Sequence, residues 1–278
     1  MKLIRFGEPG KEKPAVMISD TLLDVSDFVK DFNEDFFEND GLTALASIIE
    51  REKDELKVID KDVRLGSPVA RPSKIICIGL NYIDHAKETG AAIPLEPIIF
   101  FKSTTSLCGP FDDVVIPKNS KKTDWEVELA LVISKKASYI EEKNAMDYVA
   151  GYCLHNDYSE REFQLERGGQ WVKGKSCDSF APLGPFLATT DEIEDANNLK
   201  MWLSVNGKTF QNSNTSNLIF KIPFLIHYIS HFMTLLPGDV ISTGTPPGVG
   251  LGIKPIPVYL RAGDKVELGI EGLGTQIQ

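Results

Sequence analysis

Short apolar runs rich in valine and isoleucine, separated by glycine and proline, dominate the chain from residue 74 onward. Runs of this length and composition predict β-strands. Strands are expected at residues 75–78, 98–101, 113–116, 127–133, 149–154, 201–205, 239–242 and 265–270. Within this part, helices are expected only near residues 82–89, 160–167 and 222–234. So few helices between strands exclude a doubly wound parallel sheet and predict an α+β fold dominated by strands.

The first 60 residues are predicted to form a small α+β unit of their own. Residues 2–6 and 14–18 are β-type stretches on either side of a turn rich in Gly and Pro, which predicts a hairpin. Leu42, Leu45 and Ile49 then recur at helical spacing behind Asp40, a suitable helix N-cap. We therefore predict a small N-terminal domain with its linker at residues 1–70 and a larger catalytic domain at residues 71–278.

The balance of charge limits the kinds of partner that this chain can have. It has 278 residues and a formal charge of −10, from 30 Lys and Arg against 40 Asp and Glu, which argues against nucleic-acid binding. The apolar runs are too short to cross a bilayer, and the N-terminus does not resemble a secretory signal. Four cysteines lie far apart without a CxxC pair. These features predict a cytoplasmic protein with free thiols and no membrane partner.

The run from Trp125 to Ile133 carries two carboxylates on one face of a predicted strand. Side chains alternate between the two faces of a strand, so Glu126 and Glu128 point the same way, about 7 Å apart along it. A solvated outer face would explain the two acids. The same face continues with Ala130 and Val132, however, so the pair belongs to an otherwise apolar face. Two like charges buried there would need a counter-ion.

A third acid, Asp157, closes another predicted strand, and side chains at strand ends are well placed to project into a cleft. Ser159 and Glu162 behind it form a capping-box pattern, which predicts that a helix begins there. Together with Glu126 and Glu128, Asp157 would form an all-oxygen site suited to Mg²⁺ or Mn²⁺. Zinc fits less well because no thiolate or imidazole pair has the spacing of a zinc motif.

Another pair of titratable residues follows the predicted strand at residues 75–78. A short helix there would place His85 and Glu88 on one face, where the carboxylate can orient the imidazole or share a proton with it. An exposed polar helix face explains the same pattern equally well. The position at a strand end, where active sites collect, favours a catalytic interpretation.

Two glycine-rich segments add candidate groups for binding an anion. Residues 169–176 match the phosphate-binding pattern GxxxxGK[ST], but a predicted helix precedes them where that loop needs a strand, and a proline-rich stretch follows. We therefore do not expect nucleotide binding, and Lys175 remains a candidate cation facing an enolate or carboxylate. Thr245 lies in the loop at residues 243–250, whose hydroxyl and N–H groups can hold an anionic substrate end.

Several segments, in order along the chain, resemble the fumarylacetoacetate hydrolase family. They are EVELALVI, NDYSEREFQ, RGGQWVKGKSCDSFAPLGPF, FMTLLPGDVISTGTPPGVGLG and GDKVELGIEGLG, and the resemblance covers about residues 73–278. It implies a mixed β-sheet roll with few helices, usually dimeric. It also implies chemistry on 2-oxo and 2,4-dioxo acids with Mg²⁺ or Mn²⁺, as hydrolases, decarboxylases, isomerases or dehydratases.

The resemblance further implies roles for individual residues. Metal binding falls on Glu126, Glu128 and Asp157, catalysis on His85, Glu88 and Lys175, and substrate binding on Lys102, Arg161, Gln164 and Thr245. In the acylpyruvase-like branch, the segment that carries the histidine and glutamate orders as a lid when substrate binds. The run at residues 167–178 and the N-terminal region most resemble the branch that hydrolyses 2,4-dioxo-3-deoxy sugar acids derived from fuconate or rhamnonate.

These residues predict a metal-dependent hydrolase that cleaves a C–C bond of an acylpyruvate or a 2,4-diketo-3-deoxy sugar acid, giving pyruvate and a small acid. His85, oriented by Glu88, would activate water, and Lys175 would help to hold the pyruvate enolate. Two alternatives remain open: decarboxylation or isomerisation of a 2-oxo dioic acid, and non-catalytic binding of a 2-oxo acid. The expected partners are the small anionic substrate and a second copy of the chain in a homodimer.

Overall fold

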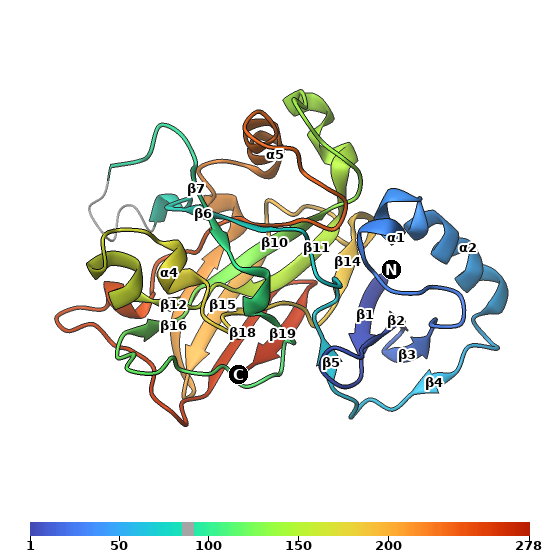
Figure 1. Cartoon of the computed structure of the whole chain (residues 1–278), viewed down its shortest axis with the longest axis horizontal. Coiled ribbons are helices and arrows are strands. Elements are labelled where there is room, and N and C mark those ends of the chain that lie inside the picture. Colours follow the sequence, from blue (N-terminus) through green and yellow to red (C-terminus); the bar gives the residue numbers. More distant parts are fainter. Residues whose placement is uncertain (85–91) are drawn as a thin grey trace.

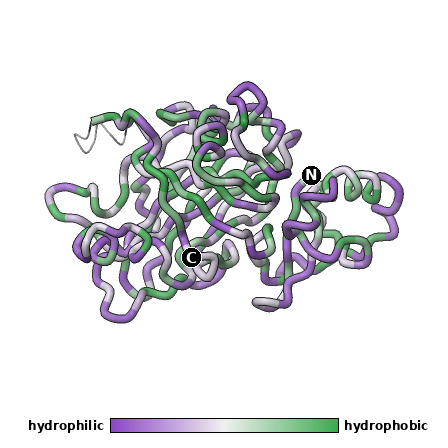
Figure 2. Tube along the Cα trace, turned by 45° about the horizontal axis from the view of Figure 1, so that its top comes forward, coloured by the Kyte–Doolittle hydropathy of each residue, from purple (hydrophilic) through white to green (hydrophobic). Residues whose placement is uncertain are grey.

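The computed structural model describes residues 1–84 and 92–278, and β-strands dominate this part of the chain (Figure 1). The strands form two main sheets, and the few helices lie at the periphery of the view. Figure 2 shows that hydrophobic residues concentrate along the central strands, while the outer loops are mostly hydrophilic. The α+β, strand-dominated class expected from the sequence is confirmed.

The larger sheet is mixed, as expected. Its neighbours along the sheet are antiparallel except for β17 and β6, which run parallel. Among the described residues, the strand order is β4 (Val58–Ile59), β3 (Thr21–Asp24), β2 (Lys13–Ile18), β1 (Lys2–Phe6), β14 (Leu187–Thr189), β11 (Val149–Asn156), β10 (Val127–Ile133), β17 (Val240–Ser242), β6 (Ile75–Gly79) and β7 (Ile98–Lys102), with β5 (Leu65–Gly66) paired to β1.

The second sheet is antiparallel and packs against the first. Its order is β16 (Lys208–Asn214), β15 (Lys200–Val205), β18 (Val266–Ile270) and β19 (Gly274–Ile277). Short pairs join β12 (Ser159–Glu160) to β9 (Thr123–Asp124) and β13 (Ala181–Pro182) to β8 (Leu107–Cys108). The helical elements are α1 (Glu34–Glu38), α2 (Gly41–Glu52), α4 (Val172–Lys175), α5 (Ile222–Ser230), the π-helix η3 (Glu162–Glu166) and the 3-10 turns η1 (Thr104–Ser106), η2 (Glu142–Tyr148), η4 (Thr190–Glu192), η5 (Thr215–Asn217) and η6 (Gly250–Gly252).

Strand β10 is buried along its whole length, and its two faces pack into different parts of the core. Val127, Leu129 and Leu131 belong to a hydrophobic cluster shared with β15 and β18 of the second sheet. Ala130 and Val132, on the opposite face, belong to another cluster shared with the N-terminal region. The alternation predicted from the sequence is confirmed, and the two glutamates therefore start from an apolar, buried face.

The N-terminal hairpin is confirmed, and it extends the larger sheet. Strand β1 pairs with β2 on one side and with β14 on the other, where Lys2 lies opposite Ala188 and Leu3 opposite Leu187. Helix α2 follows Asp40 as expected, although the Asp40 side chain forms no capping hydrogen bond. Figure 1 shows this region, in blue, at one end of the sheet. The division into two domains at residue 70 stays a prediction.

Three local predictions were wrong. Residues 113–116 form no strand, because this stretch crosses the surface and the N–H of Val115 donates to the hydroxyl of Ser179. The helix expected at residues 222–234 ends at Ser230. The capping box also fails, because Ser159 lies in β12 and donates to the carbonyl of Asp157, while Arg161 occupies the N-cap position of η3.

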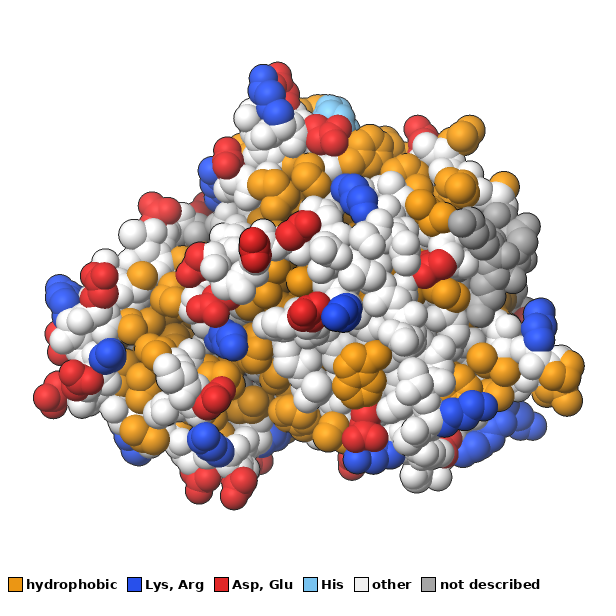
Figure 3. All heavy atoms as spheres, turned by 180° about the vertical axis from the view of Figure 1, so that it is seen from behind, with side chains coloured by type: hydrophobic (Ala, Val, Ile, Leu, Met, Phe, Trp, Pro, Cys, Tyr) orange, Lys and Arg blue, Asp and Glu red, His pale blue; other side chains and the backbone are white. Residues whose placement is uncertain are grey.

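The surface carries charged side chains of both signs. Acidic and basic side chains lie interspersed over much of the face shown in Figure 3. Within residues 1–84 and 92–278, no helix combines the length and the apolar character that crossing a bilayer requires.

Candidate functional site

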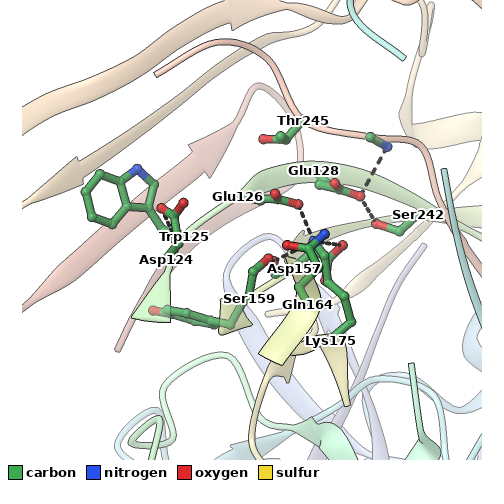
Figure 4. Close-up of polar contacts among 12 residues, drawn as sticks. Asp124, Trp125, Glu126, Glu128, Asp157, Ser159, Gln164, Lys175, Ser242 and Thr245 are labelled. Atoms are coloured by element: carbon green, nitrogen blue, oxygen red, sulfur yellow. Dashed lines mark hydrogen bonds and ion pairs between the residues drawn. The ribbon is translucent and has the colours of Figure 1, made fainter. Parts of the chain in front are cut away.

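Two neighbouring antiparallel strands bring three acidic residues together. Val127 lies opposite Asn156 in the register of β10 and β11, so Glu126 and Asp157 meet just beyond this pair, where the N–H of Asp157 donates to the carbonyl of Glu126. Oxygen atoms of Glu126, Glu128 and Asp157 lie within 4.8 Å of one another, and all three residues are buried. In Figure 4 their carboxylates gather at one point, while the Trp125 ring points away. We call these three residues the carboxylate triad.

Two lysines already contact the triad. Lys175 Nζ donates to Glu126 Oε2 at 2.6 Å and to Asp157 Oδ2 at 2.8 Å (Figure 4). Lys102 Nζ donates to Asp157 Oδ1 at 2.5 Å and to the carbonyl of Tyr158 at 3.0 Å. Burial opposes ionisation of Asp157, but the two lysines outweigh burial and hold the pKa of Asp157 below its usual range. Burial likewise disfavours the charged lysine, yet Asp157 and Glu126 raise the pKa of Lys175.

The third carboxylate has no such counter-ion. Glu128 Oε2 accepts hydrogen bonds from Ser242 Oγ at 2.5 Å and from the N–H of Gly244 at 3.1 Å. Among the described residues, no lysine or arginine forms an ion pair with Glu128. Burial raises the pKa of Glu128 well above its ordinary value, and the charges of Asp157 and Glu126 add to this. A divalent cation would supply the missing positive charge, so the all-oxygen triad fits Mg²⁺ or Mn²⁺.

Arg161 ties the triad to a fourth acid that the sequence analysis missed. It donates from Nε to Asp124 Oδ2 at 2.8 Å and from a terminal nitrogen to Glu126 Oε1 at 2.7 Å. Its other terminal nitrogen donates to Gln164 Oε1 at 3.0 Å. Asp124 also accepts from the N–H of Gly250 at 2.6 Å. Asp124 shares the parity of Glu126 and Glu128, so extending the alternation by one step would have found it.

The position of Lys175 gives the phosphate-loop sequence pattern a structural explanation that needs no bound phosphate. Helix α4 has only four residues, and its last residue, Lys175, reaches the triad. A Cβ on Gly174 would lie 2.4 Å from the carbonyl oxygen of Glu160 and 2.6 Å from the nitrogen of Gln164. Glycine is therefore required for α4 to pack against the segment after β12. Lys175, expected to be a cation facing an enolate or carboxylate, contacts two carboxylates of the triad.

A cavity of about 470 Å³ adjoins the triad, a volume typical of small-molecule sites. Glu126, Glu128 and Lys175 line its buried side, where Thr245 donates from its hydroxyl to the carbonyl of Val127 and accepts from Gln211. The other lining residues are Ile78, Gly79, Leu80, Phe100, Arg161, Gln164, Leu165, Trp171, Val249, Leu251, Gly252 and Lys254. The cavity thus joins one charged end to largely apolar walls.

Most of the predicted site residues meet at this cavity. Glu126, Glu128, Lys175, Arg161, Gln164 and Thr245 line it, while Asp157 and Lys102 support it from behind through their ion pair. His85 and Glu88 lie outside the described residues. The roles assigned to all ten side chains stay predictions, although the structure brings eight of them together.

Comparisons with known proteins agree with this geometry. The model of the fumarylacetoacetate (FAA) hydrolase C-terminal family matches residues 74–278. A protein of Burkholderia multivorans, whose curated name is provisional and says only hydrolase, is 52% identical over all of this chain and 98% of its own length.

Two solved structures are also similar over the whole chain. Maleylpyruvate hydrolase from Sphingobium sp. SYK-6, in complex with manganese(II) ion and pyruvate, is 30% identical, with a TM-score of 0.82 and 97% of that chain covered. A probable 2-hydroxyhepta-2,4-diene-1,7-dioate isomerase from Mycobacterium abscessus is 32% identical, with a TM-score of 0.81 and 97% covered.

Proposed function

The chain belongs to the fumarylacetoacetate hydrolase family, and we propose that it is a Mg²⁺- or Mn²⁺-dependent hydrolase that cleaves a C–C bond of a 2,4-dioxo acid. The observation that carries this proposal is the buried carboxylate triad beside a cavity that also contains Lys175. The maleylpyruvate hydrolase neighbour, which was solved with manganese and pyruvate, supports it. The proposed products are pyruvate and a second acid.

Glu126, Glu128 and Asp157 would hold the cation. When bound, the cation would act as a Lewis acid that stabilises negative charge on the 2-oxo acid. Arg161 holds Glu126 in place, and the loop at Gly244 holds Glu128. These contacts therefore fix Glu126 and Glu128 before any substrate enters.

In the proposed hydrolysis, water adds to the C4 carbonyl carbon and the C3–C4 bond breaks. The electron pair of that bond passes to the three-carbon fragment as an enolate, and a proton delivered to C3 completes pyruvate. The other fragment leaves as an acid that contains the oxygen of water. Lys175 supplies a fixed positive charge in the cavity, suited to stabilising the enolate. His85, oriented by Glu88, is our candidate for the base that activates water.

The cavity lining supports a proposal about the distal end of the substrate. Arg161 and Lys175 already pair with carboxylates, whereas Lys254 forms no ion pair with any described residue. Lys254 lines the same cavity as the triad glutamates, together with apolar side chains such as Trp171 and Leu251. We propose that an apolar tail lies along these walls and that its terminal carboxylate binds Lys254. The names of both structural neighbours describe molecules with two carboxylates.

Replacing Lys254 with Met should raise KM about tenfold for a 2,4-dioxo acid with a distal carboxylate, because a charged hydrogen bond of about 1.5 kcal/mol is lost. KM for a monocarboxylic acylpyruvate should not change, and neither KM should change in Lys143→Met, which alters an exposed lysine elsewhere. Steady-state assays on both substrates give the answer. An equal effect of Lys254→Met on the two substrates would contradict this assignment.

Product analysis separates hydrolysis from the alternative chemistry. The isomerase neighbour favours, as a second candidate, isomerisation or decarboxylation of a 2-oxo dioic acid. Incubation with acylpyruvates and dioxo sugar acids should give pyruvate and one further acid in equal amounts, and 2-oxo dioic acids without a 4-oxo group should remain unchanged. Release of CO₂, or an isomer with no loss of carbon, would point to the second candidate. The sugar-acid branch, the homodimer and the cytoplasmic location stay predictions.

A further inference from the structure

A hydrogen-bonded chain of side chains crosses three neighbouring strands behind the carboxylate triad. His155 on β11 lies directly opposite Glu128 on β10, and Ser242 projects from β17 on the other side of β10. Nδ1 of His155 lies 2.7 Å from Ser242 Oγ, which in turn donates to Glu128 Oε2 at 2.5 Å. All three side chains are almost completely buried. Nothing in the hydrolysis described above uses His155.

The hydrogen bonds that link His155, Ser242 and Glu128 run in a single direction when Glu128 is ionised, as a metal ligand must be. The hydroxyl of Ser242 has one hydrogen, and Glu128 accepts it. Nδ1 of His155 must therefore carry a hydrogen and donate it to Ser242.

The other ring nitrogen of His155, Nε2, is unfavourably placed in this arrangement. Nε2 of His155 is buried and has no hydrogen-bond partner among the described residues. A buried polar atom without a partner destabilises a protein, and an apolar side chain at this position would avoid that loss. Within the described part of the protein, the one hydrogen bond that the ring forms is its contact with Ser242.

The hydrogen bond from Ser242 reaches one particular oxygen of Glu128, Oε2. Ser242 and the N–H of Gly244 both donate to Oε2. Within the described part of the protein, Oε1 accepts no hydrogen bond. Two donors on one oxygen fix the rotation of the carboxylate and leave the second oxygen for another ligand.

We propose that His155 is a positioning residue for the cation site: through Ser242 it fixes the orientation of Glu128 and so increases the affinity of the triad for a divalent ion. The inference rests on the proposed function, since it needs a cation at the triad. Partners that orient metal ligands in this way typically change metal affinity by 10–100-fold.

Calorimetric titration with Mn²⁺ tests the proposal by binding alone. His155→Leu, which removes the donor, should weaken Mn²⁺ binding by roughly 10–100-fold. His155→Asn should bind within a few-fold of the wild type, because its amide N–H can replace Nδ1 as a donor. Cys153→Ala, a matched change at a buried neighbour on the same strand, should bind Mn²⁺ as the wild type does. Once Ser242 is replaced by Ala, His155→Leu should cause no further loss.

Nitrogen-15 NMR of the Mg²⁺-loaded protein gives an independent reading. We expect Nδ1 of His155 to carry a hydrogen. An Nδ1 without a hydrogen would reverse the hydrogen bond between His155 and Ser242 and overturn the proposal, even if the Leu variant fails to fold. Wild-type affinity in His155→Leu, or equal losses in the Leu and Asn variants, would overturn it as well. Failure of the wild type to bind Mn²⁺ would instead contradict the proposed function itself.

Discussion

Glu128→Gln should reduce Mn²⁺ affinity by at least about 100-fold and pyruvate release by about 1,000-fold. The substitution keeps the size of the side chain but removes the charge of the one triad member that pairs with no described lysine or arginine. Loss of Lewis-acid stabilisation worth several kcal/mol corresponds to at least three orders of magnitude in rate. Calorimetric titration and a coupled pyruvate assay measure the two effects on the same preparations.

The fold should survive this change, since burial already disfavours the charged form of Glu128. An unchanged or higher melting temperature in the absence of metal would show this. Glu141→Gln is the matched control, because Glu141 is exposed and pairs with Lys143 on the surface. It should leave both affinity and rate unchanged. Wild-type activity in Glu128→Gln would exclude the triad as the cation site.

Arg161→Met should destabilise the folded protein by about 3–5 kcal/mol, the usual result of removing one partner from a buried ion pair. The side chain of Arg161 is only 7% exposed and neutralises both Asp124 and Glu126. Methionine would fill much of the space but leave the two carboxylates without that cation. Unfolding by guanidinium chloride, followed by tryptophan fluorescence, measures the change in the free energy of unfolding.

Arg167→Met provides a control in the same short segment. Arg167 is 58% exposed and pairs with Glu162 on the surface, an arrangement worth about 0–1 kcal/mol. The contrast between the two variants separates the buried pair from a general effect of removing an arginine near η3. Similar small losses in both variants would show that Asp124 and Glu126 do not depend on Arg161.

The parts of the site that lie close together in sequence could be predicted. Glu126 and Glu128 follow from alternation in one strand, and that strand was placed correctly because its apolar run is long and bounded. Asp157 followed from its place at a strand end. The fold class was predictable for the same reason, since the other long runs also became strands. The strand prediction at residues 113–116 was wrong because a short apolar run at the surface has the same sequence pattern as a strand.

The contacts that hold the site together could not be predicted, because they join residues far apart along the chain. Ser242 meets Glu128 across 114 positions, and Asp124 meets Gly250 across 126. Which strands become neighbours decides these contacts, and the pairing of β17 with β10 is not visible in either strand alone. Asp124 is the exception, since its parity was present in the sequence.

The most direct test of metal-dependent hydrolysis is pyruvate release by metal-free enzyme before and after Mn²⁺ is restored. Protein dialysed against a chelator is given an acylpyruvate and a 2,4-dioxo acid with a distal carboxylate, and pyruvate is followed continuously. We expect the rate to fall by at least about 1,000-fold without metal and to recover when one equivalent of Mn²⁺ is added. Full turnover in the presence of chelator, with the same products, would contradict metal-dependent hydrolysis.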